Sequence, residues 1–234
     1  MYDIPVATIA GLLIALGVSL AYALAKSRNK QRPINVSLQL SWMWGLALAV
    51  LAIVVFWEQR SLASIGIVWG NYGAWAAGTM IGLTMISFTI LSLHLNLQRG
   101  GSGVPESSVQ GIKRLTDLPL WARYALVITA GVTEEILFRG YPIERLQEIT
   151  GSVWLAVLIP LVVFVLAHLG NWSLGHLVGV LFGGALLTGL YLVTRDLIAC
   201  MITHALIDTT IIFLPALLKK YGNPGIGASA RQKQ

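Results

Sequence analysis

Two adjacent acids, Glu134 and Glu135, lie in an apolar stretch of sequence, ITAGVTEEILFRG, and Arg139 follows them. An ionised side chain in the hydrocarbon region of a membrane costs roughly 2.5–3.5 kcal/mol on translocon-based scales. Two carboxylates in such a stretch therefore indicate a functional site. Glu135 and Arg139 are four residues apart on one helix face, so they are predicted to pair. Glu134 is rotated by about 100° from Glu135, so it is predicted to be unpaired and free to take part in chemistry.

Two later apolar segments carry the groups that could complete such a site. His204 and Asp208 are four residues apart, and so are Phe164 and His168, so each pair shares a helix face. A glutamate and a histidine that converge on one water form a general base. A second histidine beside a hydrogen-bonding neighbour can stabilise an oxyanion. Together these groups suffice to hydrolyse a peptide bond without a covalent intermediate.

Other polar or small residues in the apolar segments are interpreted as structural. His94, near the end of a span, and His176 are assigned to packing, and the single cysteine, Cys200, is predicted to be a buried, inert thiol. A row of glycines spaced by four predicts a face for close helix packing. The row comprises Gly175, Gly179 and Gly183.

The composition defines the fold class. Of the 234 residues, 56% are hydrophobic and 11% charged, whereas soluble domains have about 25% charged residues. The mean hydropathy is +0.75. We therefore expect one all-α integral-membrane domain over residues 1–234, a polytopic helical bundle of seven spans, with eight as the alternative. The segment 140–151 is predicted to be a loop or a short interfacial helix. The expected spans are 4–25, 38–57, 73–95, 120–140, 152–169, 174–194 and 197–218.

The net charge of +6 is interpreted as a topology signal, and no nucleic-acid motif accompanies it. In a seven-span arrangement, twelve of the 16 Lys and Arg residues fall on one side of the membrane. The positive-inside rule then places the N-terminus outside and the C-terminus in the cytoplasm. Residues 1–95 carry almost no ionisable side chain within their spans and are predicted to be scaffold, and 219–234 is predicted to be a basic polar tail.

Three short motifs also carry a resemblance to a known family. Glu134 to Arg139 matches EExxxR, Phe164 to His168 matches FxxxH, and His204 to Asp208 matches HxxxN/D. In this order, each in a separate apolar segment, they resemble the motifs of the CPBP family, the CAAX proteases and bacteriocin-processing (Abi-type) enzymes. The resemblance covers residues 115–215, which are therefore the expected catalytic core.

The resemblance implies an intramembrane glutamic endopeptidase. Glu134 would activate water with His168, and His204 with Asp208 would stabilise the oxyanion. The prenyl-protein proteases of the eukaryotic branch usually carry Asn at the last motif position, so Asp208 favours a bacterial-type enzyme in the cytoplasmic membrane and leaves a prenylated substrate in doubt. The supporting residues by motif position are Glu135, Arg139 and Phe164.

Two alternatives remain open from the sequence. Two histidines and a glutamate could bind zinc in a membrane metalloprotease, although HExxH is absent and the histidines lie on different segments. A non-enzymatic immunity or scaffold protein, or a proton-coupled carrier, could use the same buried cluster. We expect no cofactor, with zinc as the alternative. The expected partners are the lipid bilayer and a membrane-associated protein or peptide substrate, without nucleic acid; the oligomeric state is left open.

Overall fold

The computed structural model describes residues 5–27, 35–99, 117–169, 174–210 and 212–213. The regular structure of these residues is helical throughout. In chain order the elements are α1 (Val6–Leu12), η1 (Leu13–Val18), α2 (Ser19–Ser27), α3 (Val36–Ala52), η2 (Ile53–Trp57), η3 (Leu62–Ile65), α4 (Tyr72–Gln98), α6 (Leu120–Glu135), η4 (Ile136–Gly140), α7 (Tyr141–Thr150), α8 (Val153–Ala167), α9 (Leu174–Thr194) and α10 (Leu197–Asp208).

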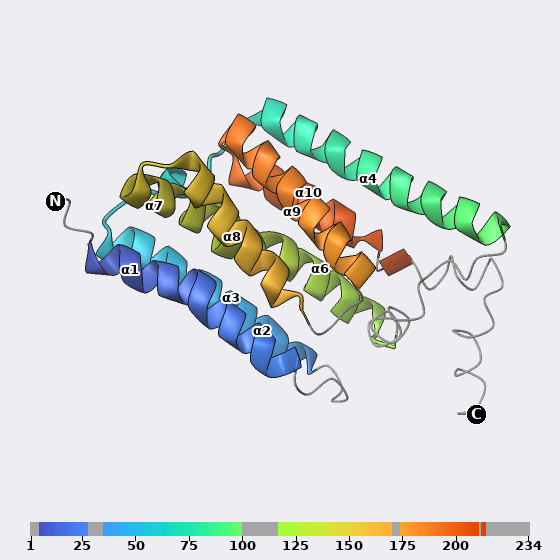
Figure 1. Ribbon diagram of the computed structural model, residues 1–234, viewed down its shortest axis with the longest axis horizontal. Coiled ribbons are helices and arrows are strands. Elements are labelled where there is room, and N and C mark those ends of the chain that lie inside the picture. Colours follow the sequence, from blue (N-terminus) through green and yellow to red (C-terminus); the bar gives the residue numbers. More distant parts are fainter. Residues whose placement is uncertain (1–4, 28–34, 100–116, 170–173, 211, 214–234) are drawn as a thin grey trace.

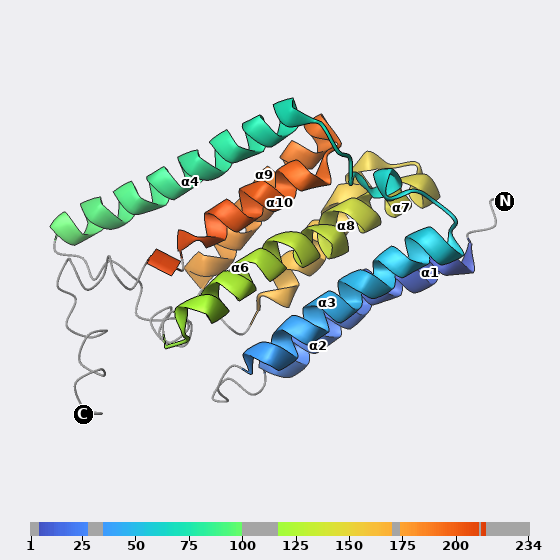
Figure 2. The same cartoon turned by 180° about the vertical axis from the view of Figure 1, so that it is seen from behind.

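The long helices lie side by side in one bundle (Figure 1; Figure 2). The pair formed by α1–α2 and α3 makes one edge, α8 and α6 lie beside it, α9 and α10 follow, and α4 makes the opposite edge (Figure 1). The prediction of an all-α bundle is confirmed for the described residues. Large apolar side chains such as Phe56, Met80, Phe88 and Phe182 are exposed on its outside, which is the arrangement that lipid requires.

Seven spans are not confirmed. Within the described residues, four helices are long and apolar enough to cross a membrane: Val6–Ala25, Val36–Trp57, Tyr72–Asn96 and Gly175–Thr194. The apolar helices α8 and α10 are shorter. The predicted span 120–140 is α6 followed by η4, a stretch that carries Glu134, Glu135 and Arg139. Much of the predicted last span, 197–218, and the whole tail 219–234 lie outside the described residues.

Helix α4 packs closely on α10 because glycines face the contact. A Cβ atom at Gly78 would lie 2.6 Å from the Ala199 carbonyl oxygen, and one at Gly82 would lie 2.8 Å from Leu206. The Thr203 hydroxyl donates to the Gly78 carbonyl at 2.9 Å. The absence of a side chain at two successive turns thus brings α4 against the helix that carries His204 and Asp208.

The segment 140–151, predicted as a loop or short interfacial helix, is the helix α7, and a buried charge network anchors it. Arg145, fully buried, pairs with Glu58 at 2.7 Å. The Tyr141 hydroxyl donates to Glu58 at 2.9 Å, and the Thr8 hydroxyl donates to the same carboxylate at 3.1 Å. Burial alone raises the pKa of Glu58, but these hydrogen bonds outweigh burial and hold it below its ordinary value of 4.5.

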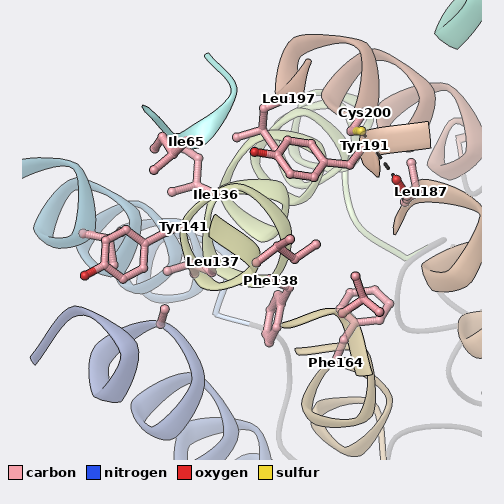
Figure 3. Close-up of a cluster of buried hydrophobic side chains, with 14 of the residues drawn as sticks. Ile65, Ile136, Leu137, Phe138, Tyr141, Phe164, Leu187, Tyr191, Leu197 and Cys200 are labelled. Atoms are coloured by element: carbon pink, nitrogen blue, oxygen red, sulfur yellow. Dashed lines mark hydrogen bonds between the residues drawn. The ribbon is translucent and has the colours of Figure 1, made fainter. Parts of the chain in front are cut away.

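An apolar core joins α6, η4, α8, α9 and α10. Figure 3 shows Phe138 and Phe164 facing one another, with ring centroids 5.3 Å apart at an interplanar angle of 70°. Across the core, the Cys200 thiol on α10 lies 3.6 Å from the Leu187 carbonyl oxygen on α9. The thiol is fully buried, which confirms the prediction that Cys200 is a buried cysteine. This core holds the polar cluster described next.

Candidate active site

Both acids of the first motif are positioned by the end of α6. The close approach of α6 to α10 depends on Gly131, where a Cβ atom would lie 3.0 Å from the Ala205 Cβ. The next turn of α6 therefore reaches His204 on α10. After Glu135 the helix continues as the π-helical segment η4, and such segments are frequent at functional sites.

Glu135 is the centre of the buried charges. Its Oε1 accepts from Arg139 Nη1 at 2.8 Å, as the spacing predicts, and both side chains are almost completely buried. The same oxygen also lies 2.6 Å from His204 Nδ1. Sequence reasoning missed this second contact, because a spacing within one helix carries no information about a partner on another. Glu135 therefore does more than neutralise Arg139, because it also orients the imidazole of His204.

Two further carboxylates surround the other nitrogen of His204. His204 Nε2 lies 3.5 Å from Asp208 Oδ2 and 3.9 Å from Glu134 Oε2. The interpretation of Glu134 as unpaired is thus corrected, since this long contact with His204 is present. The exposed fraction of the side chain rises from 0% for Glu135 to 18% for Glu134 and 28% for Asp208. The cluster is thus fully buried at Glu135 and partly exposed at Glu134 and Asp208.

The second motif lies against this cluster through an aromatic ring. The Arg139 guanidinium carbon is 4.1 Å from the Phe164 ring centroid, within the range of a cation–π interaction. The His168 ring is 4.7 Å from the same centroid. His168 Nδ1 lies 2.8 Å from the Phe164 carbonyl oxygen. A carbonyl only accepts, so this contact puts a proton on Nδ1 and, in the neutral ring, leaves the lone pair on Nε2.

Among the described residues, His168 and Glu134 do not form the direct contact that their expected joint action on one water suggests. Within the described residues, no hydrogen bond or ion pair joins His168 to Glu134. His168 directly follows α8, and Pro160 lies inside that helix. The tertiary structure thus brings Glu134, Glu135, His204 and Asp208 into one cluster and places His168 one aromatic ring away from Arg139.

A residue that the sequence reasoning set aside lies close to this cluster. His176 of α9 interacts electrostatically with both His168 and Asp208. Its sequence context, SLGHLVG, matches none of the three motifs.

The predicted glycine packing face is wrong for Gly179 and Gly183. A Cβ atom at either position would meet nothing within 4 Å. Gly184 makes the close approach instead, because a Cβ atom there would lie 2.8 Å from Leu161 and 3.2 Å from Phe164. A spacing of four marks a helix face without saying which face meets a neighbour.

The donor set gives limited support to a bound metal. A zinc site requires three or four ligands at about 2.0–2.3 Å from the ion. Within the described part of the chain, no group of three or more His, Cys, Asp or Glu side chains is arranged to hold a metal ion. The oxygens and nitrogens of the cluster are instead engaged with one another, as in the contacts of Glu135 with Arg139 and His204.

Four described helices are long and apolar enough to cross a membrane, which fits an integral membrane protein, and the cluster of acids and histidines is a candidate hydrolytic centre. Residues 116–210 match the family described as Type II CAAX prenyl endopeptidase Rce1-like. All three motifs lie within this match, and the resemblance drawn from them is confirmed. No curated protein and no solved structure matches the chain.

The region that holds the cluster is thus similar to the CAAX protease (CPBP) family. This similarity is to a family of proteases, and the apolar helices of the chain fit an integral membrane protein.

Proposed function

We propose that this protein is an intramembrane endopeptidase that hydrolyses a peptide bond of a membrane-associated protein or peptide by a metal-free, glutamic mechanism. The observation that carries the proposal is the setting of His204. Its Nδ1 is held by Glu135 at 2.6 Å, and its Nε2 faces Glu134 and Asp208. An imidazole fixed at one nitrogen and directed by carboxylates at the other is preorganised for proton and charge handling.

Glu134 and His168 are proposed to activate water. His168 Nε2 bears the lone pair, because Nδ1 is engaged with the Phe164 carbonyl, and Glu134 is the partly exposed acid of the tandem. The water would lie between these two groups. As it adds to the substrate carbonyl, its proton passes to the base. The proton is then delivered to the leaving amine as the C–N bond breaks.

His204 is proposed to stabilise the oxyanion, with Asp208 as its partner. With one proton on each nitrogen, His204 donates to Glu135 from Nδ1 and has an Nε2–H available for the developing negative charge. Asp208 Oδ2, 3.5 Å from Nε2, directs that N–H. Arg139 and Phe164 are proposed to support this arrangement. The Arg139 guanidinium donates to the Glu135 carboxylate and lies over the Phe164 ring.

The setting of the protein in the membrane is part of the proposal. The charge distribution supports a cytoplasmic C-terminus and an external N-terminus, and the HxxxD form of the last motif supports a bacterial cytoplasmic membrane. The seven-span arrangement would need α6 with η4, α8 and α10 to cross in addition to the four longer helices. The family name suggests a prenylated substrate, whereas Asp208 at the last motif position counts against one.

The experiment compares membrane peptides from cells that carry the native protein with those from cells that carry Glu134→Gln. Peptides produced only by the native protein identify the substrate, which is then cleaved by purified protein in detergent. We expect Glu134→Gln and His168→Ala each to lower the cleavage rate by at least about 100-fold, as loss of one acid–base group does. Glu148→Gln, at a half-exposed acid outside the cluster, is the matched control and should keep its activity. Native turnover by Glu134→Gln would refute the assignment.

A further inference from the structure

We propose that Gly184 of α9 is a positioning residue of this site, which keeps the Phe164 ring and the Arg139 guanidinium in place because it has no side chain. The inference rests on the proposed peptidase function. None of the three motifs includes this glycine. Two other glycines of the same helix, Gly179 and Gly183, face open space, since a Cβ atom at either would meet nothing within 4 Å.

Gly184 is buried where α9 packs against α8 and η4. A Cβ atom at this position would lie 2.8 Å from Leu161 Cδ1, 3.2 Å from Phe164 Cδ1 and 3.3 Å from Arg139 Nη2. All three distances are shorter than the separation of about 3.5–4.0 Å at which non-bonded carbon atoms attract best. Glycine is disfavoured in a helix interior relative to alanine. Its presence here is explained by the close approach of α8 and η4.

The three neighbours of this glycine differ in their freedom to move. Leu161 is half-buried, and its Cδ1 is the end of a flexible side chain that can rotate away. The Phe164 ring is buried and already has neighbours on other sides. Its centroid lies 4.1 Å from the Arg139 guanidinium carbon, 4.7 Å from the His168 ring and 5.3 Å from the Phe138 ring. A side chain at position 184 would therefore displace the ring and the guanidinium by a few tenths of an ångström.

Such a displacement reaches both parts of the proposed chemistry. The Phe164 ring contacts His168, one of the two groups proposed to activate water, and the Phe164 carbonyl oxygen lies 2.8 Å from His168 Nδ1. The Arg139 guanidinium donates to Glu135, whose Oε1 lies 2.6 Å from His204 Nδ1. The glycine thus acts on the proposed base through the aromatic ring and on the proposed oxyanion donor through the guanidinium.

The test measures kcat, KM and Tm of Gly184→Ala in detergent, with the substrate identified by the membrane-peptide comparison. A misplacement of about 1 Å can cost about 100-fold in rate, so a shift of a few tenths of an ångström should lower kcat by about tenfold. KM should stay within about twofold of the native value, because the loss is one of transition-state stabilisation.

The matched controls are Gly179→Ala and Gly183→Ala, which add the same methyl group to the same helix in open space. Both variants should keep the native kcat. Both should also be at least as stable as the native protein, because alanine favours a helix more than glycine does.

Leu161→Ala separates positioning from packing. This change removes the shortest contact of the added methyl group and leaves those with Phe164 and Arg139. If Gly184 acts as proposed, the double variant Gly184→Ala with Leu161→Ala should regain the Tm of Leu161→Ala alone. Its kcat should remain about tenfold below that of Leu161→Ala.

A kcat that recovers together with Tm in this double variant would overturn the inference, because the loss would then be one of packing alone. The inference would also be overturned by a native kcat in Gly184→Ala, by an equal loss in Gly183→Ala, or by a double variant that does not fold. An inactive native protein would instead refute the peptidase function, so the two failures are distinguishable.

Discussion

Substituting Glu135 with Ala should destabilise the protein far more than the same change at Glu134. The Glu135 carboxylate is fully buried and accepts from both Arg139 and His204. Its removal leaves a guanidinium that is 1% exposed without its carboxylate partner. Breaking a buried pair from one side costs roughly 3–5 kcal/mol. Glu134 is 18% exposed and has one long contact at 3.9 Å, so Glu134→Ala should cost no more than about 1 kcal/mol.

The thermal unfolding of these variants can be followed through Cys200. Cys200 is the single cysteine of the chain and is fully buried, so a thiol-reactive fluorophore reports unfolding in detergent. For chains of roughly this length, 1 kcal/mol corresponds to a shift of about 2–4 °C in Tm. We therefore expect Glu135→Ala to lower Tm by roughly 6–20 °C and Glu134→Ala by less than about 4 °C.

A double variant tests the cause of the loss. Glu135→Leu with Arg139→Leu removes both buried charges, so part of the stability should return relative to Glu135→Leu alone, as it does when a buried pair is replaced as a whole. Equal and native-like Tm values for Glu134→Ala and Glu135→Ala would refute the reasoning. So would a double variant less stable than Glu135→Leu, since that would mean the unpaired guanidinium is not the main cost.

Three further predictions concern the His204–Asp208 pair, the dependence of activity on metal, and the dependence of stability on pH. In a cycle on the cleavage rate, His204→Ala and Asp208→Ala should each remove much of the activity and the double variant little more; fully additive losses would mean independent roles. Activity should survive dialysis against a strong chelator, and loss restored specifically by zinc would favour a metalloprotease. The pKa of Glu58 is lowered in the folded protein, so its stabilisation is complete above its unfolded-state value near 4.5 and is lost as pH falls through the lower folded-state value. The Tm difference between the native protein and Glu58→Gln should therefore shrink on acidification below about pH 4.5; a constant difference would contradict this linkage.

Local spacing and hydropathy were sufficient to predict the helical class and the pairing of Glu135 with Arg139. An apolar run of about 20 residues predicts a helix because lipid leaves the backbone no other partner. A separation of four predicts the Glu135–Arg139 pair because it is set by helix geometry alone. The three motifs, read as a resemblance, located the region that the family match covers.

Contacts between helices could not be predicted in this way. His204 and Glu135 are 69 residues apart in the chain, and nothing in either local pattern specifies that they meet. The meeting depends on Gly131, which lets α6 approach Ala205. The same reason explains the misassigned glycine face: Gly179 and Gly183 share a helix face, but only packing decides that Gly184 meets Phe164.

What the sequence determined by itself was therefore the set of chemically capable side chains and the helices that carry them, because both depend on interactions within a few residues. The tertiary structure decided which acid holds His204, and that His168 and Arg139 both lie against the Phe164 ring. These relations depend on the rotation and depth of each helix against its neighbours. Rotation and depth are set by packing over the whole bundle, and a local pattern does not encode them.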